Sequence, residues 1–155
     1  YQMNFTTDMS EAEYLREAFY RDDLPLAEDI KIEQDKINRS DVLVFIYPIF
    51  WTEAPAKLVG WFDRVWTYGF AYGSRKMKKL DKALFLCTAG NTKDDLEKYG
   101  HITAMKTVMI GDRINDRVKD VGFFIFDGTS RHDMNLREKK IEKHLKEIYD
   151  IGLNI

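Results

Sequence analysis

Large aromatic side chains occupy a segment in which a loop would ordinarily be polar. Phe50 and Trp51 follow an apolar run over residues 42–47 and lie between Pro48 and Pro55. The two prolines stiffen this segment and remove two backbone donors. A planar, apolar cofactor is one reason to place aromatics there. Packing beneath a neighbouring helix or in a subunit interface is the alternative.

A second candidate segment is the turn formed by Thr88, Ala89, Gly90 and Asn91, which follows the apolar run 83–87. Small residues let a backbone approach a ligand closely, and successive amides there can bond ring carbonyls or phosphates. Many strand-to-helix turns share this composition. Ligands of open α/β sheets bind beyond the carboxyl ends of the strands, so we expect both segments at one rim. Together they would form a cleft with an aromatic wall and a polar backbone floor.

The elements that would position these segments follow from hydrophobic patterning. The runs 42–47, 83–87 and 122–126 are apolar without alternation, which is typical of parallel strands covered on both faces. Helical spacing predicts helices over 11–20 (with a Ser10–Glu13 capping box), through 30–37 and ending before Asp41, over 55–66, over 101–119 with a break near Gly111, and over 133–151 with Gly152 as C-cap. The alternation of strand and helix predicts a single α/β domain over residues 1–155, with a doubly wound parallel sheet.

Composition excludes several function classes. A net charge of −2 provides no electrostatic footprint for a polyanion, so no nucleic-acid partner is expected. The single cysteine, Cys87, excludes an internal disulfide and favours a reducing compartment. The longest apolar run, 42–51, is too short to span a membrane, and no secretory signal is present, so we expect a cytoplasmic protein without membrane insertion. His132 and His144 lack metal-ligand spacing, and no metal site is expected.

Three motifs in combination resemble the NAD(P)H:quinone oxidoreductase (DT-diaphorase-like) family, which has a flavodoxin-like fold. The resemblance is strong from about residue 34 to residue 92 and looser beyond. The motifs are the tryptophan loop 47–51, the helix Pro55-Ala56-Lys57-Leu58-Val59-Gly60-Trp61-Phe62-Asp63-Arg64-Val65, and the loop Gly69-Phe70-Ala71-Tyr72-Gly73.

The resemblance implies a flavin cofactor, FMN or FAD, and a homodimer built largely on helix 55–66. It implies that Tyr72 reaches across the dimer to cover the partner's substrate pocket, and that the amides of residues 89–91 stabilise the charge of the reduced flavin. The reaction implied is hydride transfer from NAD(P)H through the flavin to a quinone-type acceptor, by a ping-pong mechanism. The cofactor-binding positions implied are Gln34, Pro48, Ile49, Phe50, Trp51, Thr88, Ala89, Gly90 and Asn91.

Two departures from the family stand out. The position of a tyrosine that some members use in a proton relay falls on Leu96, and His101 lies only near the corresponding histidine, so no catalytic residue is assigned. The segment 1–5 also resembles the part that follows the second strand of a flavodoxin-like domain. The fold would then lack its N-terminal central strand and phosphate loop, which would leave 42–47 as an open apolar edge and weaken flavin binding. A partial chain, a truncated product, or a partner that supplies the edge would each account for this.

Other functions remain open from the sequence. The same family includes regulatory flavoprotein subunits of potassium efflux transporters. A one-electron carrier like flavodoxin is disfavoured by the weak net charge, because acidic surfaces steer such carriers to their partners. A cofactor-poor, truncated remnant that keeps the dimer helix is a further alternative.

Overall fold

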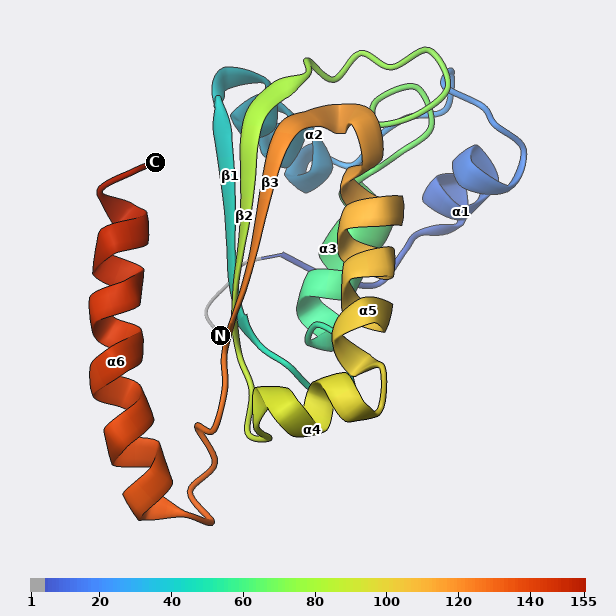
Figure 1. The fold of residues 1–155 in the computed structure, drawn as a ribbon. Coiled ribbons are helices and arrows are strands. Elements are labelled where there is room, and N and C mark those ends of the chain that lie inside the picture. Colours follow the sequence, from blue (N-terminus) through green and yellow to red (C-terminus); the bar gives the residue numbers. More distant parts are fainter. Residues whose placement is uncertain (1–4) are drawn as a thin grey trace.

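Three parallel strands in the order β1-β2-β3 form the sheet at the centre of the structure (Figure 1). The structure is a computed structural model, and it describes residues 5–155. In the register of the sheet, Phe45 of β1 lies beside Phe85 of β2, which lies beside Phe123 of β3. The strands are β1 (Val42–Pro48), β2 (Leu80–Thr88) and β3 (Val118–Phe126).

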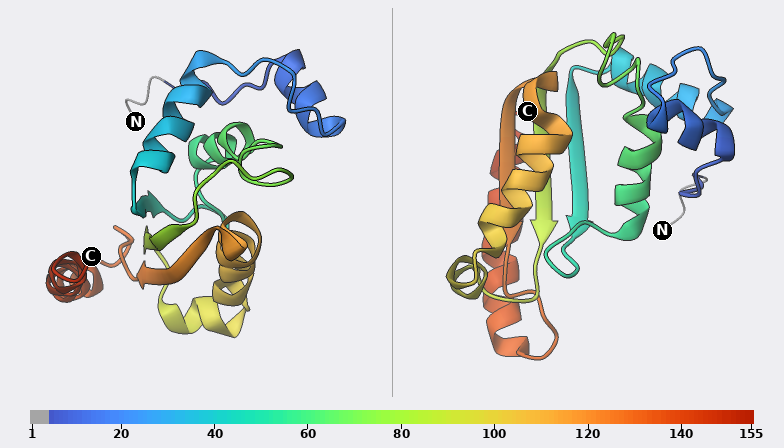
Figure 2. Two further views of the ribbon diagram at one scale, coloured as in Figure 1. Left: turned by 90° about the horizontal axis from the view of Figure 1, so that it is seen from above. Right: turned by 90° about the vertical axis from the view of Figure 1, so that its right-hand side faces the viewer.

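Helices cover both faces of this sheet, which confirms the doubly wound α/β architecture. One face packs against α3 and α5, and within residues 5–155 the helix on the other face is α6 (Figures 1 and 2). The helices are α1 (Glu11–Ala18), α2 (Glu28–Arg39), α3 (Ala56–Val65), α4 (Lys93–Lys98), α5 (His101–Lys106) and α6 (Met134–Gly152), with a π-helix η1 (Thr107–Ile114) and a 3-10 turn η2 (Asn115–Arg117).

Several predicted boundaries were wrong. The helix expected over 101–119 ends earlier, and Gly111 lies inside η1 rather than at a break. The chain turns instead at Asn115, which has a positive φ of 47°, and Trp66 Nε1 donates to the nearby carbonyl of Arg113 at 2.6 Å. Gly152 is still helical, with the cap one residue later. The short helix α4 was not predicted.

The expectation that all three strands are covered on both faces holds for β2 but not for β1. Residues 83–87 are buried throughout, whereas Val44 and Ile46 are 42% and 75% exposed. The cause is that α6 lies over β2 and β3, and no helix within residues 5–155 covers the same face of β1. In that range β1 also pairs only with β2, so the predicted open apolar edge at 42–47 is confirmed.

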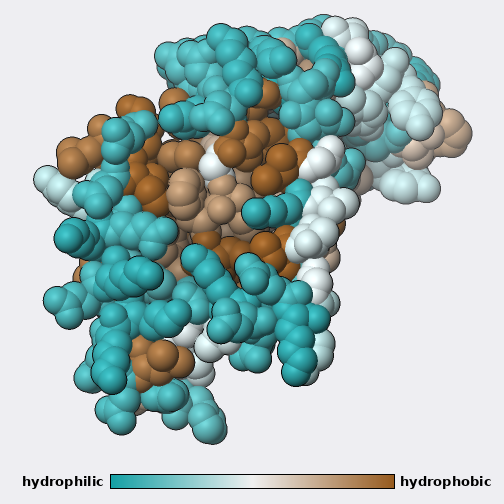
Figure 3. All heavy atoms as spheres, in the orientation of Figure 1, coloured by the Kyte–Doolittle hydropathy of each residue, from teal (hydrophilic) through white to brown (hydrophobic). Residues whose placement is uncertain are grey.

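Apolar side chains are also visible from the side of β3. In Figure 3 they gather between α6 and the helices of the opposite face. Val121, Phe123 and Phe124 of β3 are half-buried, and the charged pair Lys119 and Asp120 follows the first residue of the strand. Charged residues at the start of an edge strand disfavour pairing with another chain.

The main core lies between the sheet and α3. Phe85 is fully buried and stacks on Phe45 at 4.9 Å between ring centroids, while Phe62 and Trp66 of the α3 region close the layer from above. Aromatic contacts of this geometry add to the burial of apolar area. Part of the high aromatic content of the chain is thus used in the core.

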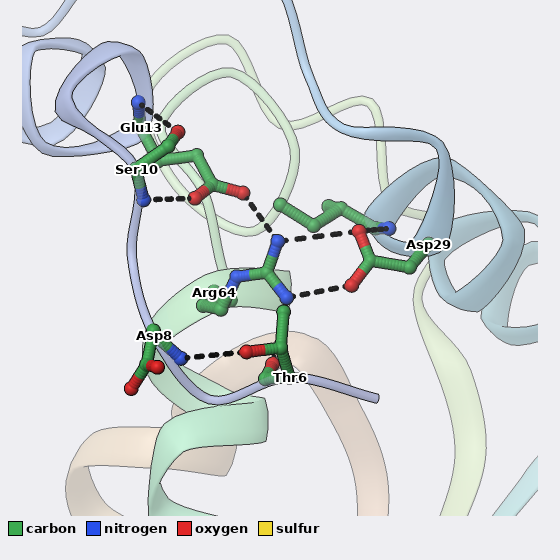
Figure 4. Close-up of polar contacts among 7 residues, drawn as sticks. Thr6, Asp8, Ser10, Glu13, Asp29 and Arg64 are labelled. Carbon is green, nitrogen blue, oxygen red and sulfur yellow. Dashed lines mark hydrogen bonds and ion pairs between the residues drawn. The ribbon is translucent and has the colours of Figure 1, made fainter. Parts of the chain in front are cut away.

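A buried ion network joins the first three helices (Figure 4). Arg64 of α3 donates through Nη2 to Glu13 of α1 at 2.6 Å, and through Nη1 to Asp29 of α2 at 2.6 Å. Nη1 also donates to the carbonyl of Thr6 at 2.7 Å. The second oxygen of Glu13 accepts from the Ser10 amide, which completes the predicted capping box. One guanidinium therefore positions α1, α2 and the N-terminal segment against α3.

Gly60 marks the place where the N-terminal segment crosses α3. A Cβ at Gly60 would lie 2.6 Å from Cβ and 2.7 Å from Cγ2 of Thr7, so one element must move. We expect Gly60→Ala to lower the free energy of unfolding by about 1–3 kcal/mol in chemical denaturation, despite the better helix propensity of alanine. The control is Gly111→Ala, where no atom lies within 4 Å, and which should not destabilise. A Gly60→Ala variant as stable as the parent would show that residues 5–9 contribute little to stability.

None of the helices in the described part of the chain is both long and apolar enough to cross a membrane. Over the same residues, the side chains of His, Cys, Asp and Glu form no group of three or more that could hold a metal ion.

Candidate functional site

The aromatic loop and the glycine turn lie side by side at one rim of the sheet. Pro48, the last residue of β1, is the register partner of Thr88, the last residue of β2. The amide of Ile49 continues the ladder and donates to the carbonyl of Thr88 at 2.8 Å. The parallel strands therefore bring the two predicted segments together at their carboxyl ends, where α/β sheets bind ligands.

The aromatic loop is a tight, strained turn. The amides and carbonyls of Phe50 and Glu53 bond each other at 2.9 Å, and the two residues between them, Trp51 and Thr52, have φ of 51° and 63°. Left-handed backbone is unfavourable for a side chain with a Cβ, and more so for a β-branched one. The turn leaves Trp51 fully exposed and Phe50 53% exposed. Strain that displays an apolar ring to solvent is a reason to suspect a ligand or partner at this loop.

Ile49 differs from its two neighbours in the loop. Its side chain is half-buried and packs against both core clusters, including Ala89, Leu96 and Ile125 below the rim. Ile49 thus anchors the exposed aromatic residues of the loop to the core.

The glycine turn is held by the loop that follows β3. Ala89 donates its amide to the carbonyl of Phe126 at 2.9 Å, and the amide of Thr129 donates to the Ala89 carbonyl at 3.0 Å. The expectation that all three amides of residues 89–91 face a ligand was therefore wrong for Ala89, whose amide completes the sheet. The amides of Gly90 and Asn91 have no acceptor within residues 5–155.

Gly90 is not required by the protein's own packing. Its φ is not positive, and a Cβ there would meet only Ser130 Cβ, at an ordinary contact distance of 3.6 Å. The space beside this glycine would accept a flat group placed against the amides of residues 90 and 91. The rim therefore fits a planar ring that carries hydrogen-bond acceptors, such as a flavin.

Asp127 joins the first residue of α4, which follows the glycine turn, to α6. It is buried, and its Oδ2 accepts from the Lys93 amide at 2.9 Å and from Lys140 Nζ at 2.8 Å. Burial alone would raise the pKa of Asp127, but the bonds from Lys140 and the Lys93 amide bring that pKa below its usual value. Asp127 was not singled out from the sequence, because a buried anchor and a turn-forming aspartate look alike in one sequence.

Two buried polar atoms that find no partner among the described residues border a hollow of about 370 Å³ on the α6 side of the rim. One is Nε of Arg137. The other is Nδ1 of His144, whose Nε2 lies 2.8 Å from the carbonyl of Asp127 and must carry the proton, since a carbonyl only accepts. This hollow offers a guanidinium group and an imidazole nitrogen to a polar ligand group. The further lining residues include Thr88, Phe126, Thr129, Ile141, Leu145 and Ile148. Sequence reasoning assigned no role to Arg137.

The structure does not bring Gln34 to the rim. The Gln34 amide is buried and donates to the carbonyl of Val65 at 3.1 Å and to Thr67 Oγ1 at 3.0 Å. These partners lie at the C-terminal end of α3, whereas the aromatic loop precedes its N-terminal end. A helix of ten residues separates the two ends by about 15 Å. In this chain Gln34 holds α2 against α3.

Tyr72 also lies away from the rim of its own chain. Its loop is at the opposite end of the sheet (Figure 2), where the hydroxyl of Tyr72 donates to Glu17 of α1. Burial and the neighbouring carboxylate raise the pKa of Tyr72. A contact between Tyr72 and a substrate would therefore require a second subunit.

The other residues considered from the sequence, Cys87, Leu96 and His101, pack against neighbouring residues of the fold. Cys87 is fully buried, and burial raises the pKa of its thiol to about 11, so it packs as a small apolar residue. Leu96 is buried in the small cluster below the rim. His101 is half-buried at the first residue of α5, with its ring 5.9 Å from that of Tyr99.

Comparison with known proteins agrees with this geometry. A family model described as the flavodoxin-like fold matches residues 1–151. A solved NAD(P)H:quinone oxidoreductase from Methanothermobacter marburgensis is 46% identical, with a TM-score of 0.83 over 92% of this chain and 73% of its own.

Two curated relatives are informative. An uncharacterised NAD(P)H oxidoreductase of Haemophilus influenzae is 30% identical over 151 residues, which are 92% of this chain and 71% of that protein. The human ribosyldihydronicotinamide dehydrogenase [quinone] is 47% identical over 80 residues, 48% of this chain and 35% of its own. The chain therefore belongs to the flavodoxin-like family of oxidoreductases that includes the NAD(P)H:quinone oxidoreductases.

Proposed function

We propose that the protein is a flavin-dependent NAD(P)H:quinone oxidoreductase that transfers two electrons as hydride, with NAD(P)H and a quinone-type acceptor using one pocket in turn. The observation that carries this proposal is the meeting of the aromatic loop and the glycine turn at one rim. Loop and turn are joined by the bond from the Ile49 amide to Thr88. A pocket used in sequence by two substrates implies ping-pong kinetics. The relatives named as quinone oxidoreductases support the same reaction.

The residues of the rim would divide the work of holding a flavin. Trp51 and Phe50 would cover the flat ring, with Pro48 and Ile49 beneath, while the amides of residues 90 and 91 would bond its polar edge. Arg137 would neutralise a phosphate or another polar group on the α6 side. When bound, the flavin supplies the hydride chemistry, and the protein orients substrates over one ring face. Preorganised amides at the polar edge would stabilise negative charge as it develops.

A homodimer would complete the pocket. Tyr72 cannot reach the rim of its own chain, so its proposed contact is with the pocket of a partner subunit. The outer face of α3 is suited to this role, because a shallow hollow of about 750 Å³ runs from Phe50 and Trp51 along Val59 and Asp63. A dimer that forms through this face of α3 would bring the aromatic loop of each subunit close to its partner.

The direct test is a visible absorption spectrum of the purified chain, before and after addition of FMN or FAD, with mass analysis of released cofactor. We expect the absorption bands of bound flavin and turnover of a quinone with NADH or NADPH. A preparation that stays colourless with either flavin would remove the assignment for this chain.

Trp51→Ala tests the aromatic wall directly. We expect the dissociation constant for flavin, followed by quenching of flavin fluorescence, to rise about tenfold through loss of ring stacking. Tyr149→Ala is the control, because Tyr149 is an exposed aromatic on α6, away from the aromatic loop. Equal affinities for Trp51→Ala and the parent would place the flavin elsewhere or give the tryptophan to a subunit interface.

A further inference from the structure

The loop that carries Tyr72 is fixed from a distant part of the sequence. Both carboxylate oxygens of Glu17, on α1, lie 3.1 Å from the amide of Tyr68, and Oε2 also accepts the hydroxyl of Tyr72. Arg16 on the same helix donates to the carbonyl of Tyr68 at 3.3 Å. The contacts from Glu17 span 51 and 55 residues of sequence, so α1 sets the loop's position.

The same contacts fix the direction of the Tyr72 proton. A phenol has one donor hydrogen, and an ionised carboxylate only accepts. With that hydrogen on Glu17, the Tyr72 oxygen has only lone pairs to offer a further partner. Partial burial and the charge of Glu17 also raise the pKa of Tyr72, which keeps the phenol protonated. Among the described residues, the phenols of Tyr20 and Tyr68 also influence this hydroxyl, and a phenol is a weaker acceptor than a carboxylate.

From this geometry we infer that Glu17 is a specificity-determining positioning residue, which makes Tyr72 an acceptor toward the ligand it faces. This inference rests on the proposed function, which places Tyr72 over the partner's substrate pocket. The favoured ligand groups are then hydrogen-bond donors, namely the carboxamide of a nicotinamide or the hydroxyl of a hydroquinone. A quinone carbonyl, which only accepts, gains no bond from Tyr72.

Glu17→Gln reverses this polarity with little change in shape. The Tyr68 amide needs an acceptor, so the amide oxygen of the introduced side chain turns toward it and the NH₂ group turns toward Tyr72. The Tyr72 oxygen then accepts from that NH₂ group, and its own hydrogen is released toward the ligand. Glu11→Gln is the control, because it removes the same charge from an exposed position on the same helix.

The first measurement is independent of catalysis. Tyrosine ring carbons, labelled at Cζ and assigned with Tyr72→Phe, report phenol ionisation by NMR. We expect the Tyr72 signal of the parent and of the control Glu11→Gln to remain un-ionised up to high pH, and the signal of Glu17→Gln to titrate at lower pH. An unchanged titration in Glu17→Gln would overturn the inference, whatever the chain's activity.

The second measurement follows ligand preference in the chain supplied with flavin. For Glu17→Gln we expect the KM for quinone to fall about fivefold and the inhibition constant of the hydroquinone to rise by a similar factor, as one hydrogen bond is exchanged. A purely structural role would change thermal stability and leave this ratio at the parent value, which would overturn the inference. If the parent itself shows no flavin binding or turnover, the proposed function fails, and the specificity role of Glu17 fails with it. The NMR titration then still decides whether Glu17 directs the Tyr72 proton.

Discussion

Replacing Arg64 by methionine is expected to lower the free energy of unfolding by about 3–5 kcal/mol, because it leaves a buried carboxylate without its partner. Arg64 and Glu13 both have side chains only 3% exposed, so water cannot take over the lost bonds. The change would also free the carbonyl of Thr6 and one side of Asp29. Chemical denaturation at neutral pH measures the loss.

A matched exposed pair provides the control. Arg39 and Asp35 bond at 3.0 Å on the surface of α2, with both side chains largely in solvent. Arg39→Met should change stability by no more than about 0.5 kcal/mol. Adding Glu13→Gln to Arg64→Met should recover part of the loss, since the unpaired charge is then gone. A loss below about 1 kcal/mol for Arg64→Met would show that the helices hold together without the network.

The pH dependence gives this prediction a second test. In the parent, burial would raise the pKa of Glu13, but the bonds from Arg64 and the Ser10 cap bring it below its usual value; the Arg64 bond likewise lowers the pKa of Asp29. Groups with a lowered folded pKa stabilise above their unfolded pKa of about 4, and that contribution is lost as pH falls. In Arg64→Met the buried Glu13 carboxylate is destabilising, and its protonation relieves the penalty. The stability difference between parent and variant should therefore shrink as pH falls from about 7 toward about 4.

Patterns local in sequence predicted the fold well. Apolar runs located all three strands, because each strand carries apolar side chains on both of its faces, including the face of β1 that is exposed. The strand order then placed Pro48 beside Thr88, as expected of carboxyl ends in one sheet. The capping box at Ser10 was also a local pattern, and the structure contains both of its bonds.

Features that depend on distant contacts could not be predicted in the same way. Arg64 was part of a recognised helix motif, but its partners on α1 and α2 lie 51 and 35 residues away. The exposure of Ile46 depends on where α6 lies, which its own neighbours in sequence do not encode. Gln34 was assigned by resemblance alone, and its buried bonds to α3 give it a structural use instead.

The second large effect is expected at Asp127. Asp127→Ala removes the acceptor of the Lys93 amide and the partner of Lys140, and we expect a loss of about 3 kcal/mol in unfolding free energy. Because Asp127 joins α6 to the segment after the glycine turn, the variant should also bind flavin more weakly than the parent. Asp133→Ala is the matched control. Asp133 caps α6 at an exposed position by accepting from Leu136, and its loss should cost only about 1 kcal/mol.

Hydrogen exchange separates loosening of the turn from a general loss of stability. The amides of Gly128 and Thr129 donate to Asn91 and Ala89, so they report whether the turn stays attached. In Asp127→Ala their protection should fall by more than the global loss of stability requires, whereas in Asp133→Ala it should follow global stability.

Asp127→Asn keeps an acceptor for Lys93 and removes the charge. Since the folded pKa of Asp127 is lowered, the charge stabilises above about pH 4, and the advantage of the parent over Asp127→Asn should disappear as pH falls below that range. An advantage that persists in acid would mean that shape, rather than the carboxylate charge, holds the turn to α6.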